Sequence, residues 1–517
     1  MQPSKTPIVR LNCTEHKSRK PHVITIAFAS ILAFPDFLVV NFGMMKSYLL
    51  ILGLATFAWP LFPQSITVSS EISLKSQYVY DILGKYEENI LMIQDGISEF
   101  DIQAFDKDMI MTWVEEETLD SRRSRIIDII PHKNTFSVVY SDENSDSLII
   151  KSRQYDSRVK LISTDTLKIF KRSLIRPKFR FNKSEDHSKF LIAEIESDKV
   201  ASAFVFDLLN RHVLWDAKFE FQEINFREEY RKTILDNRGE MFLIFEKNNL
   251  QYKIHEHSME IFKFNHRRQK FDFISVPLTE FTTYDVFMKF DNLNDQVVIA
   301  GLFSDKRQGT TDGIFFISVD AVGFTNYNIS TIEYSQELVS EFYGTFNSKR
   351  ESLYNLDIQD IICRQDGGVL LFAEENKEYE RLAYGSRRDY YGNSRYSVDY
   401  YYEDIILVSI HPDGRSHWQK LLPKRQYSND DEALYSSYFM VKNPSYLRIL
   451  YNDEIRSENT VSEYVLNGAG DISRRSLMST DNQKLKLQIK NAVQVASNEV
   501  IVPSIRGKRM RLVRLIY

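Results

Sequence analysis

The stretch that decides the fold is DVFMKFDNLNDQVVIAGLFSD, residues 285–305. It contains one strand, a short turn rich in Asp and Asn, and a second strand that is almost continuously apolar. The segment DGIFFISVD (312–320) and a weaker strand at Tyr327–Glu333 follow it. Four short strands joined by polar turns predict an antiparallel four-stranded sheet over residues 285–333.

The same strand–turn–strand unit recurs along the chain. Its copies begin at Tyr78, Arg125, Lys178, Tyr230, Asp285, Asp357, Ser436 and Gln488. Their apolar second strands begin near Ile90, Phe136, Phe190, Met241, Val297, Val369, Tyr446 and Val500. Most copies are about fifty residues apart, and an all-strand period of this length is typical of β-propeller blades.

The number of copies and the two ends of the repeat predict how the propeller closes. Eight copies favour eight blades, with seven as the alternative because the copy at Tyr78 is the least regular. The last copy ends with RMRLVRLIY (509–517), which leaves room for only three strands. The segment SITVSSEIS (65–73) can supply the missing outer strand and so remove the open sheet edges. We therefore predict an all-β, eight-bladed propeller over residues 65–517.

Residues 44–64 have the anatomy of a secretory signal peptide. The stretch MMKSYLLILGLATFAWPLFPQS (44–65) contains Lys46, an apolar run and helix-breaking prolines. The apolar run is shorter than the roughly 20 residues that a membrane-spanning helix needs. We expect cleavage near Gln64 or Ser65, and an exported protein in the periplasm or at the outer cell surface.

The signal lies unusually far from the first residue. Residues 1–43 are interpreted as an upstream extension that is not part of the working protein. In the alternative, the apolar segment Val23–Phe42 and the signal-like segment form a membrane hairpin. Pro35 and Asp36 stand near the middle of Val23–Phe42, and a carboxylate at the bilayer centre is costly. We therefore favour the first interpretation, with membrane contact only through the signal peptide or an uncleaved amino-terminal segment.

The composition and the motifs present narrow the function classes. Formal net charge is −5, from 66 basic and 71 acidic residues, which argues against nucleic acid as a partner. The sequence has no HExxH, GxSxG, GxxxxGK[ST] or CxxC motif, so we predict no catalytic residue, metal or cofactor. Cys363 is expected to be a small buried strand residue. His255 and His257 could share one strand face, where a solvated or packed role is favoured over metal binding.

Two insertions interrupt the repeat on either side of the first hairpin of one blade. The insertion at 335–354 precedes the copy at Asp357, and the insertion at 376–403 joins the second and third strands of that copy. In a propeller both kinds of loop open on the same face, so we expect the insertions to lie side by side.

The second insertion, within EYERLAYGSRRDYYGNSRYSVDYYYED (378–404), is rich in Tyr and Arg. These residue types are enriched at binding hot spots, and tyrosines also stack on sugars. The candidate binding residues are Tyr384, Arg387, Arg388, Tyr390, Tyr391, Arg395, Tyr396, Tyr400, Tyr401 and Tyr402. The competing interpretation is an extended hairpin whose tyrosines pack on one another and on the neighbouring insertion.

The hairpins at 297–320 and 366–375, with DIILVSIHPDGRSHWQKLLPKRQ (404–426), resemble a group of secreted β-propeller-like proteins of Bacteroidota. That group is largely of unknown function, so the resemblance implies a fold and an envelope location but no catalytic residues. We predict a binding or scaffolding module for an envelope protein or a glycan. The alternative is a propeller enzyme, such as a glycan-active hydrolase or lyase, with its site at the central channel.

Overall fold

The computed structural model describes residues 65–75, 79–171, 178–221, 223–305, 309–344, 351–382, 396–453, 455, 460–480 and 485–517. All of them belong to one compact unit, Pro63–Tyr517. The predictions about residues 1–64 lie outside the described residues. In the described ranges, no helix combines the length and apolar character required to cross a membrane.

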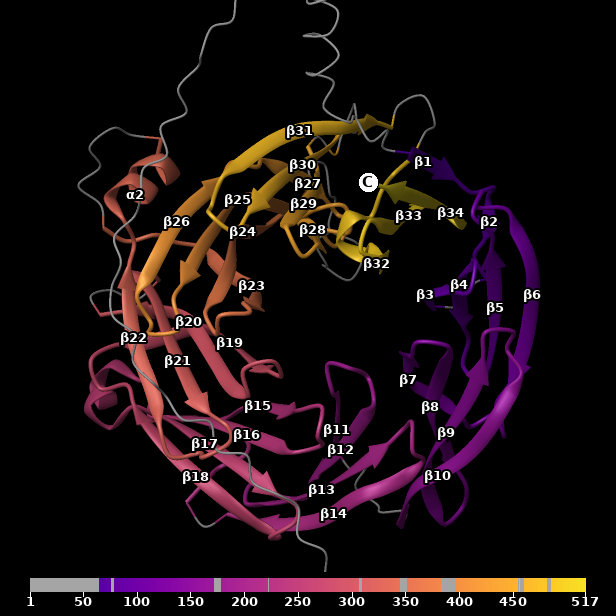
Figure 1. Cartoon of the computed structure of the whole chain (residues 1–517), viewed down its shortest axis with the longest axis horizontal. Coiled ribbons are helices and arrows are strands. Elements are labelled where there is room, and N and C mark those ends of the chain that lie inside the picture. Colours follow the sequence, from indigo (N-terminus) through magenta and orange to yellow (C-terminus); the bar gives the residue numbers. More distant parts are fainter. Residues whose placement is uncertain are drawn as a thin grey trace, which may run out of the picture. The chain divides into compact units, whose positions relative to one another are not determined.

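Eight antiparallel blades stand in a ring and form an eight-bladed β-propeller (Figure 1). Blades 1 and 2, each listed from the inner to the outer strand, are β3 (Val79–Tyr86), β4 (Asn89–Asp95), β5 (Glu99–Phe105), β6 (Met111–Thr118); and β7 (Arg125–Pro131), β8 (Thr135–Glu143), β9 (Ser147–Asp156), β10 (Leu161–Lys171). Blades 3 and 4 are β11 (Lys178–Lys183), β12 (Lys189–Ile195), β13 (Val200–Asp207), β14 (His212–Glu220); and β15 (Tyr230–Leu235), β16 (Met241–Lys247), β17 (Ser258–Asn265), β18 (Lys270–Pro277).

The second half of the ring carries the extra elements. Blades 5 and 6 are β19 (Thr282–Asp291), β20 (Gln296–Ser304), β21 (Gly313–Asp320), β22 (Tyr327–Glu333); and β23 (Leu356–Cys363), β24 (Val369–Leu382), β25 (Tyr396–Ile410), β26 (Ser416–Leu422), with β27 (Gln426–Asn429) beside β25. Blades 7 and 8 are β28 (Tyr438–Lys442), β29 (Tyr446–Asn452), β30 (Thr460–Asn467), β31 (Ile472–Ser479); and β32 (Val493–Ala496), β33 (Glu499–Arg506), β34 (Arg509–Ile516), β1 (Ser65–Val68), with β2 (Ile72–Ser73) on β34. The helices within the described residues are η1 (Gln251–Glu256), α2 (Gln336–Phe342) and η3 (Ile489–Asn491).

The second strand of each blade is apolar because neighbouring blades cover both of its faces. In β20, every residue after Gln296 is buried, which explains why this strand shows a continuous apolar run instead of an alternating one. Separate clusters of buried side chains lie between successive blades, for example between blades 4 and 5 and between blades 5 and 6. All eight second strands begin at, or one residue before, the positions predicted from the sequence.

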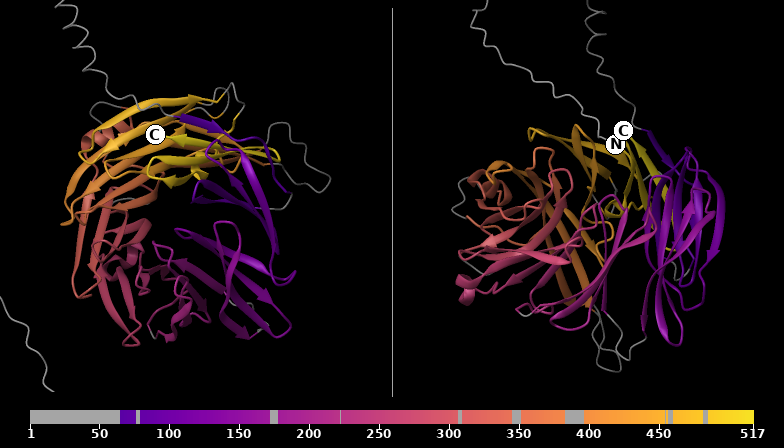
Figure 2. Two further views of the ribbon diagram at one scale, coloured as in Figure 1. Left: turned by 45° about the vertical axis from the view of Figure 1, so that its right-hand side comes forward. Right: turned by 60° about the horizontal axis from the view of Figure 1, so that its bottom comes forward.

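The amino-terminal strand closes the ring, as predicted. Strand β1 pairs antiparallel with β34, from Ser65 opposite Ile516 to Val68 opposite Val513. It thereby becomes the outer strand of blade 8, and both views in Figure 2 show the indigo start of the propeller near its yellow end. A further cluster of buried side chains joins blade 8 to blade 1, so the eighth interface resembles the others.

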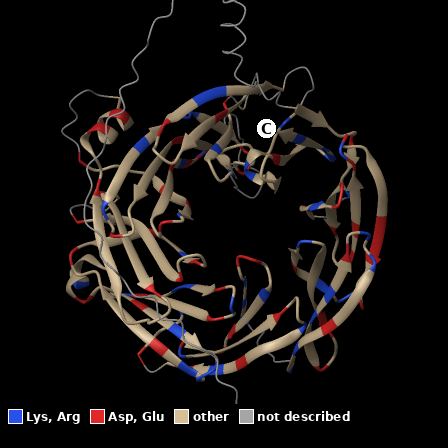
Figure 3. Cartoon of the chain, in the orientation of Figure 1, with Lys and Arg blue, Asp and Glu red and all other residues tan. Residues whose placement is uncertain are grey.

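Charged residues of both signs are distributed around the ring (Figure 3).

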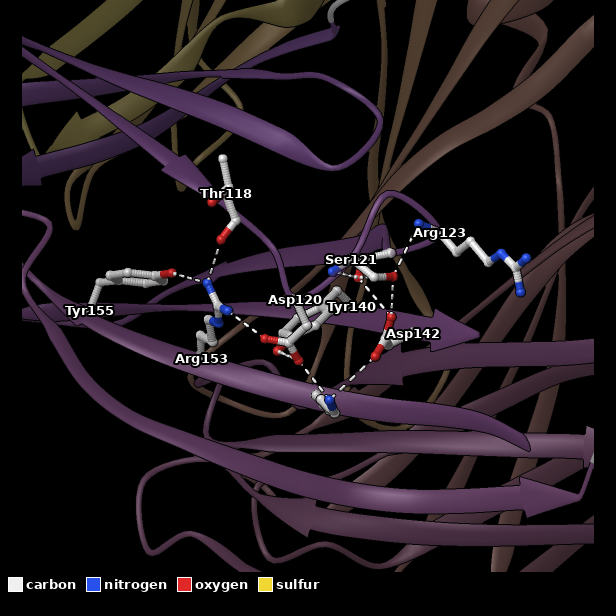
Figure 4. Close-up of polar contacts among 10 residues, drawn as sticks. Thr118, Asp120, Ser121, Arg123, Tyr140, Asp142, Arg153 and Tyr155 are labelled. Atoms are coloured by element: carbon white, nitrogen blue, oxygen red, sulfur yellow. Dashed lines mark hydrogen bonds and ion pairs between the residues drawn. The ribbon is translucent and has the colours of Figure 1, made fainter. Parts of the chain in front are cut away.

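Polar side chains near the end of a second strand anchor the linker between blades. Figure 4 shows one such anchor in blade 2, where Asp142 accepts a hydrogen bond from the Ser121 hydroxyl at 2.7 Å. Asp142 also accepts one from the Ser124 hydroxyl at 3.0 Å. Both serines belong to the linker that leaves blade 1. The linker is therefore held by side chains of the blade that follows it.

Asp120 in the same linker is fixed by two cations of strand β9. The Lys151 ammonium lies 2.6 Å and the Arg153 guanidinium 2.5 Å from its carboxylate. Burial opposes the charged form of Asp120, but the hydrogen bonds from Lys151 and Arg153 prevail and lower its pKa to about 2. Asp120, Lys151 and Arg153 therefore have a structural role, which is to hold the linker on blade 2.

Candidate functional site

Blade 6 continues beyond the propeller as a three-stranded sheet, which we call the blade 6 extension (residues 376–382, 396–402 and 426–429). A register shift after Glu374 marks where it begins. From there β24 and β25 stay paired, from Asn376 opposite Tyr402 to Leu382 opposite Tyr396. Strand β27 adds to the other edge of β25. The sequence indicated the hairpin but gave no sign of this third strand.

The extension has two faces with different roles, because alternate residues of a strand point to opposite sides. On the face that we call the locked face, the Tyr379 and Tyr401 rings lie 5.8 Å apart, and the Tyr401 and Tyr427 rings lie 4.9 Å apart. The expectation that tyrosines of this hairpin pack on one another is met on this side. These aromatic contacts stiffen the extension.

Asp399 is the polar centre of the locked face. It pairs with Arg381, and it accepts hydrogen bonds from the Tyr427 hydroxyl at 2.7 Å and the Asn429 amide at 2.8 Å. The hydrogen bond from Arg381, followed by that from Tyr427, lowers the pKa of Asp399 to about 2. One carboxylate thus joins all three strands of the extension.

Tyr396, Tyr400 and Tyr402 lie at alternate positions of β25 on the opposite side, which we call the open face. Tyr396 is 62% exposed, whereas Tyr400 and Tyr402 are half-buried. Glu378 lies opposite Tyr400 in the register. Desolvation is the main cause that raises the pKa of Tyr400, and the charge of Glu378 is the second. The open face therefore combines tyrosine rings with negative charge.

Six of the ten candidate binding residues lie outside the described residues: Tyr384, Arg387, Arg388, Tyr390, Tyr391 and Arg395. The structure brings Tyr396, Tyr400 and Tyr402 to the open face and Tyr401 to the locked face. Arg381, an arginine of the same insertion, is engaged within the sheet by Asp399.

A buried ion pair supports the base of the extension. The Glu374 carboxylate and the Lys424 ammonium lie 2.8 Å apart, and both side chains are fully buried. Lys424 also donates to the Tyr402 carbonyl at 3.0 Å and to the Gln426 side chain at 2.9 Å, so it connects β25 and β27. Burial lowers the pKa of Lys424, while the adjacent Glu374 opposes that shift. Ser437 donates to Glu374 at 2.6 Å and ties the pair to blade 7.

The other insertion meets the extension at its base. Its helix α2 begins after Ser335, whose hydroxyl accepts a hydrogen bond from the Leu338 amide at 3.2 Å. The residue Tyr354, which ends this insertion, packs under the Lys377 ammonium, 5.5 Å from the ring centre. The two insertions therefore lie side by side on the same end of the propeller.

The inner strands carry charged side chains around the central axis. Asp81, Asp128 and Asp360 each accept the main-chain N–H of the isoleucine that follows, at 2.7–2.8 Å. The sequence contained a signal for this set, because Asp-Ile-Leu or Asp-Ile-Ile occurs in the first strand of three repeat copies. Lysines pair with two of these aspartates from neighbouring blades, Lys183 with Asp128 at 3.1 Å and Lys442 with Asp360 at 3.3 Å.

Two cavities open between inner strands. One, of about 200 Å³ between blades 1 and 2, is lined by Asp81, Asp95 and Asp128. Burial raises the pKa of Asp95 to about 6 and also raises that of Asp81. The other, of about 330 Å³, lies between blades 3, 4 and 5 and is lined by Lys183, Lys232 and Lys289 among others. Sequence reasoning identified neither cavity, since their walls come from separate repeat copies.

Two smaller predictions met different outcomes. His255 and His257 do not share a strand face, because residues 251–256 form η1, a short 3₁₀ helix. His257 is buried and contacts the Glu246 carboxylate at 3.1 Å. Cys363 is half-buried in β23, and burial raises its pKa to about 12. Among the described residues, no group of three or more His, Cys, Asp or Glu is arranged to hold a metal ion.

Comparison with known proteins finds distant structural neighbours, and no family follows from them. No family model and no curated protein sequence matches the chain. The WD40 domain of SCAP from fission yeast is 10% identical, with 88% of this chain and 98% of that chain covered and a TM-score of 0.37. The Nup133 β-propeller domain of Vanderwaltozyma polyspora is 11% identical, with 75% and 99% covered and a TM-score of 0.34. The assignment to eight-bladed β-propellers rests on the blade topology itself.

Proposed function

We propose that the protein is an exported propeller of the cell envelope that binds a protein or a glycan through the open face of the blade 6 extension. The observation that carries the proposal is the contrast between the two faces. The locked face is held by Asp399 and by ring contacts that engage Tyr379, itself 55% exposed, while the open face presents Tyr396 at 62% exposure on the opposite side from those contacts. A rigid sheet that presents tyrosines loses little conformational entropy on binding.

The charge of the open face indicates which partners suit it. Glu378 and Glu380 are exposed on this side of β24, so a partner with basic groups gains from complementary charge. A glycan is the other suitable partner, because its rings stack on tyrosine and its hydroxyls donate to carboxylates. The six candidate residues from Tyr384 to Arg395, which lie outside the described residues, remain part of the proposal on the ground of their residue types alone.

The test compares tyrosines on two blades. A double variant, Tyr396→Ala with Tyr400→Ala, removes rings of the open face without touching the locked face. Tyr252→Ala is the matched control, because Tyr252 is 80% exposed in η1, between the second and third strands of blade 4. In capture from envelope extract and on a glycan array, we expect at least tenfold weaker recovery for the double variant than for the wild type. The control variant should be recovered as well as the wild type. Equal recovery by all three proteins would contradict the proposal.

The proposed export rests on the signal anatomy of residues 44–64. Mass determination of the mature amino terminus, on protein isolated from the envelope fraction, is the direct check. We expect it to lie near Gln64 or Ser65. A mature terminus upstream of Met44 would overturn the proposed processing.

One observation favours the alternative, an enzyme acting on glycans near the central axis. Asp95, with its pKa near 6, is protonated in part at neutral pH, while Asp128 stands beside Lys183. A carboxylic acid and a carboxylate in one cavity are the two groups that glycoside hydrolysis uses. We expect no activity on a panel of glycans. Hydrolysis that is lost in Asp95→Asn and kept in Asp146→Asn, on an exposed turn of blade 2, would establish the alternative.

A further inference from the structure

The lysine-lined cavity lies at the end of the propeller opposite to the extension. Its walls are the inner strands β11, β15 and β19, and its rim includes the turns that join the first and second strands of blades 3 and 5. The extension instead grows from the connection between a second and a third strand. The two features thus use different ends of the ring.

The rim of this cavity is tied together by hydrogen bonds between turns of three blades. The main-chain N–H of Asp186 donates to the side-chain oxygen of Asn237 at 3.1 Å. The main-chain N–H of Asn237 donates to the side-chain oxygen of Asn292 at 3.0 Å. Asn292 in turn donates to the Glu185 carboxylate at 2.8 Å. Because neighbouring turns brace one another, the cavity is pre-formed and does not need a ligand to assemble it.

Positive charge dominates the wall. Each of the three blades contributes one lysine, and Glu185 on the rim is the single carboxylate among the described residues that line the cavity. Lys183 is neutralised by Asp128. No carboxylate of the described residues forms an ion pair with Lys232 or Lys289. The Lys232 ammonium lies 4.7 Å from the centre of the Phe287 ring, and the charge of Asp360 opposes the lowering of the Lys232 pKa in part.

The ammonium groups of these two lysines retain unused donors. Lys232 donates to the Met288 carbonyl at 2.7 Å, and Lys289 donates to the Ile361 carbonyl at 3.2 Å. An ammonium has three donors, so each lysine can bind a further acceptor. Burial, followed by the charge of Lys289, lowers the pKa of Lys232. An anion between them would offset both the desolvation and the like-charge repulsion.

We propose that this cavity binds a small ligand through an oxyanion, a phosphate or carboxylate group held by Lys232 and Lys289. A volume of about 330 Å³ is near the lower end of the roughly 300–1,000 Å³ found for small-molecule sites, which favours a small molecule over a polymer. Lysine supplies a compact point charge that suits phosphate, and carboxylate shares the same recognition chemistry. The proposed site is independent of the open face and of the function proposed for it.

The first test measures binding of defined anions to the full-length protein by calorimetry. Inorganic phosphate, pyrophosphate and citrate are titrated separately at constant ionic strength, with chloride as the reference. We expect binding of at least one of them, and the ranking of phosphate compounds against citrate distinguishes the two sources of the oxyanion. Lys232→Gln and Lys289→Gln should each weaken binding at least tenfold. Lys270→Gln, an exposed lysine of the outer strand β18, should leave it unchanged.

The second test needs no variant and so remains informative if a lysine variant folds poorly. Wild-type protein is acetylated briefly with and without the best-binding anion, and labelling of each lysine is followed by mass spectrometry. We expect the anion to slow labelling of Lys232 and Lys289 several-fold and to leave Lys270 unaffected. The proposal would be overturned if no probe binds up to about 10 mM. It would also be overturned if the anion changes the labelling rate of all three lysines by the same factor.

Discussion

Blades 5 and 6 are neighbours with nearly the same inner hairpin, yet one ends at the ring and the other continues past it. Counted from the first valine of each apolar second strand, Val297 and Val369, the position of Leu302 in blade 5 is held by Glu374 in blade 6. Leu302 is 1% exposed, and Glu374 is fully buried. A propeller blade therefore does not need a charge at this position. The carboxylate and its partner Lys424 belong to the extension, whose strands Lys424 connects through Tyr402 and Gln426.

This contrast separates two uses of the same repeat. The blade core is built from apolar second and third strands, and it tolerates long insertions because they leave the ring at one end. Blade 6 adds the buried Glu374–Lys424 ion pair, whereas blade 5 has the apolar Leu302 at the corresponding position. The strongest test of the comparison is to break the buried pair that blade 5 lacks.

Removing either partner of the Glu374–Lys424 pair should produce the largest effect. Glu374→Leu or Lys424→Met leaves one buried charge without its partner, and we expect a loss of about 3–5 kcal/mol in the free energy of unfolding. The double variant Glu374→Leu with Lys424→Met removes both charges and should cost less than either single change. Urea unfolding of the three proteins measures this, and additive losses would contradict an interaction between the two residues.

Leu302→Ala is the matched change in blade 5. It leaves a cavity in a packed core, and we expect a loss of about 2–5 kcal/mol. Combined with Lys424→Met, its effect should be independent of that change. Rescue of Leu302→Ala by Lys424→Met would show that the two blades are coupled in a way that the comparison does not include.

The helix between the two blades should contribute less. Ser335→Ala removes the hydroxyl that accepts the Leu338 amide, and we expect a loss of about 1 kcal/mol in unfolding free energy. Ser335→Thr keeps an acceptor at the same position and should restore most of the stability. Thermal unfolding of the three proteins checks this, and equal stability of the alanine variant and the wild type would be evidence against the cap.

Asp399 should affect the extension alone. Its pKa in the folded protein, about 2, lies below the ordinary value of 3.8. The ionised carboxylate therefore stabilises the extension fully at pH values above 3.8. This stabilisation is lost as the pH falls toward about 2. Asp399→Asn should expose the amides of β27 to several-fold faster hydrogen exchange at neutral pH, with blade 5 unchanged. Faster exchange throughout both blades would show that the extension is not a separate unit.

The smallest effect on stability is expected at the open face. Tyr396 is exposed, so Tyr396→Ala should change the free energy of unfolding by no more than about 0.5 kcal/mol. The same change should weaken partner binding, which separates a binding role from a structural one. A large loss of stability would show that Tyr396 has a structural role, as the residues of the locked face do.

The sequence determined the ring well because blade cores follow a local pattern. Apolar runs such as Val297–Phe303 are buried on both faces, and their period predicted eight second strands. The incomplete last copy predicted a closing strand within residues 65–73, and in the structure Ser65–Val68 forms it. The candidate site was predictable only in part. The hairpin was visible from its tyrosines. Glu374 and Lys424 are separated in the sequence by β25 and β26, and no local sequence pattern indicates that they pair. Lys232 and Lys289 come to line the same cavity only when blades 4 and 5 stand side by side.

Hydrogen exchange of the β25 amides at residues 396–402 tests the central claim most directly, namely that blade 6 carries a preformed sheet beyond the ring. We predict protection of these amides within tenfold of that at residues 405–410, which lie in the blade itself. Exchange of residues 396–402 at the rate of an unstructured chain, with residues 405–410 still protected, would contradict the claim.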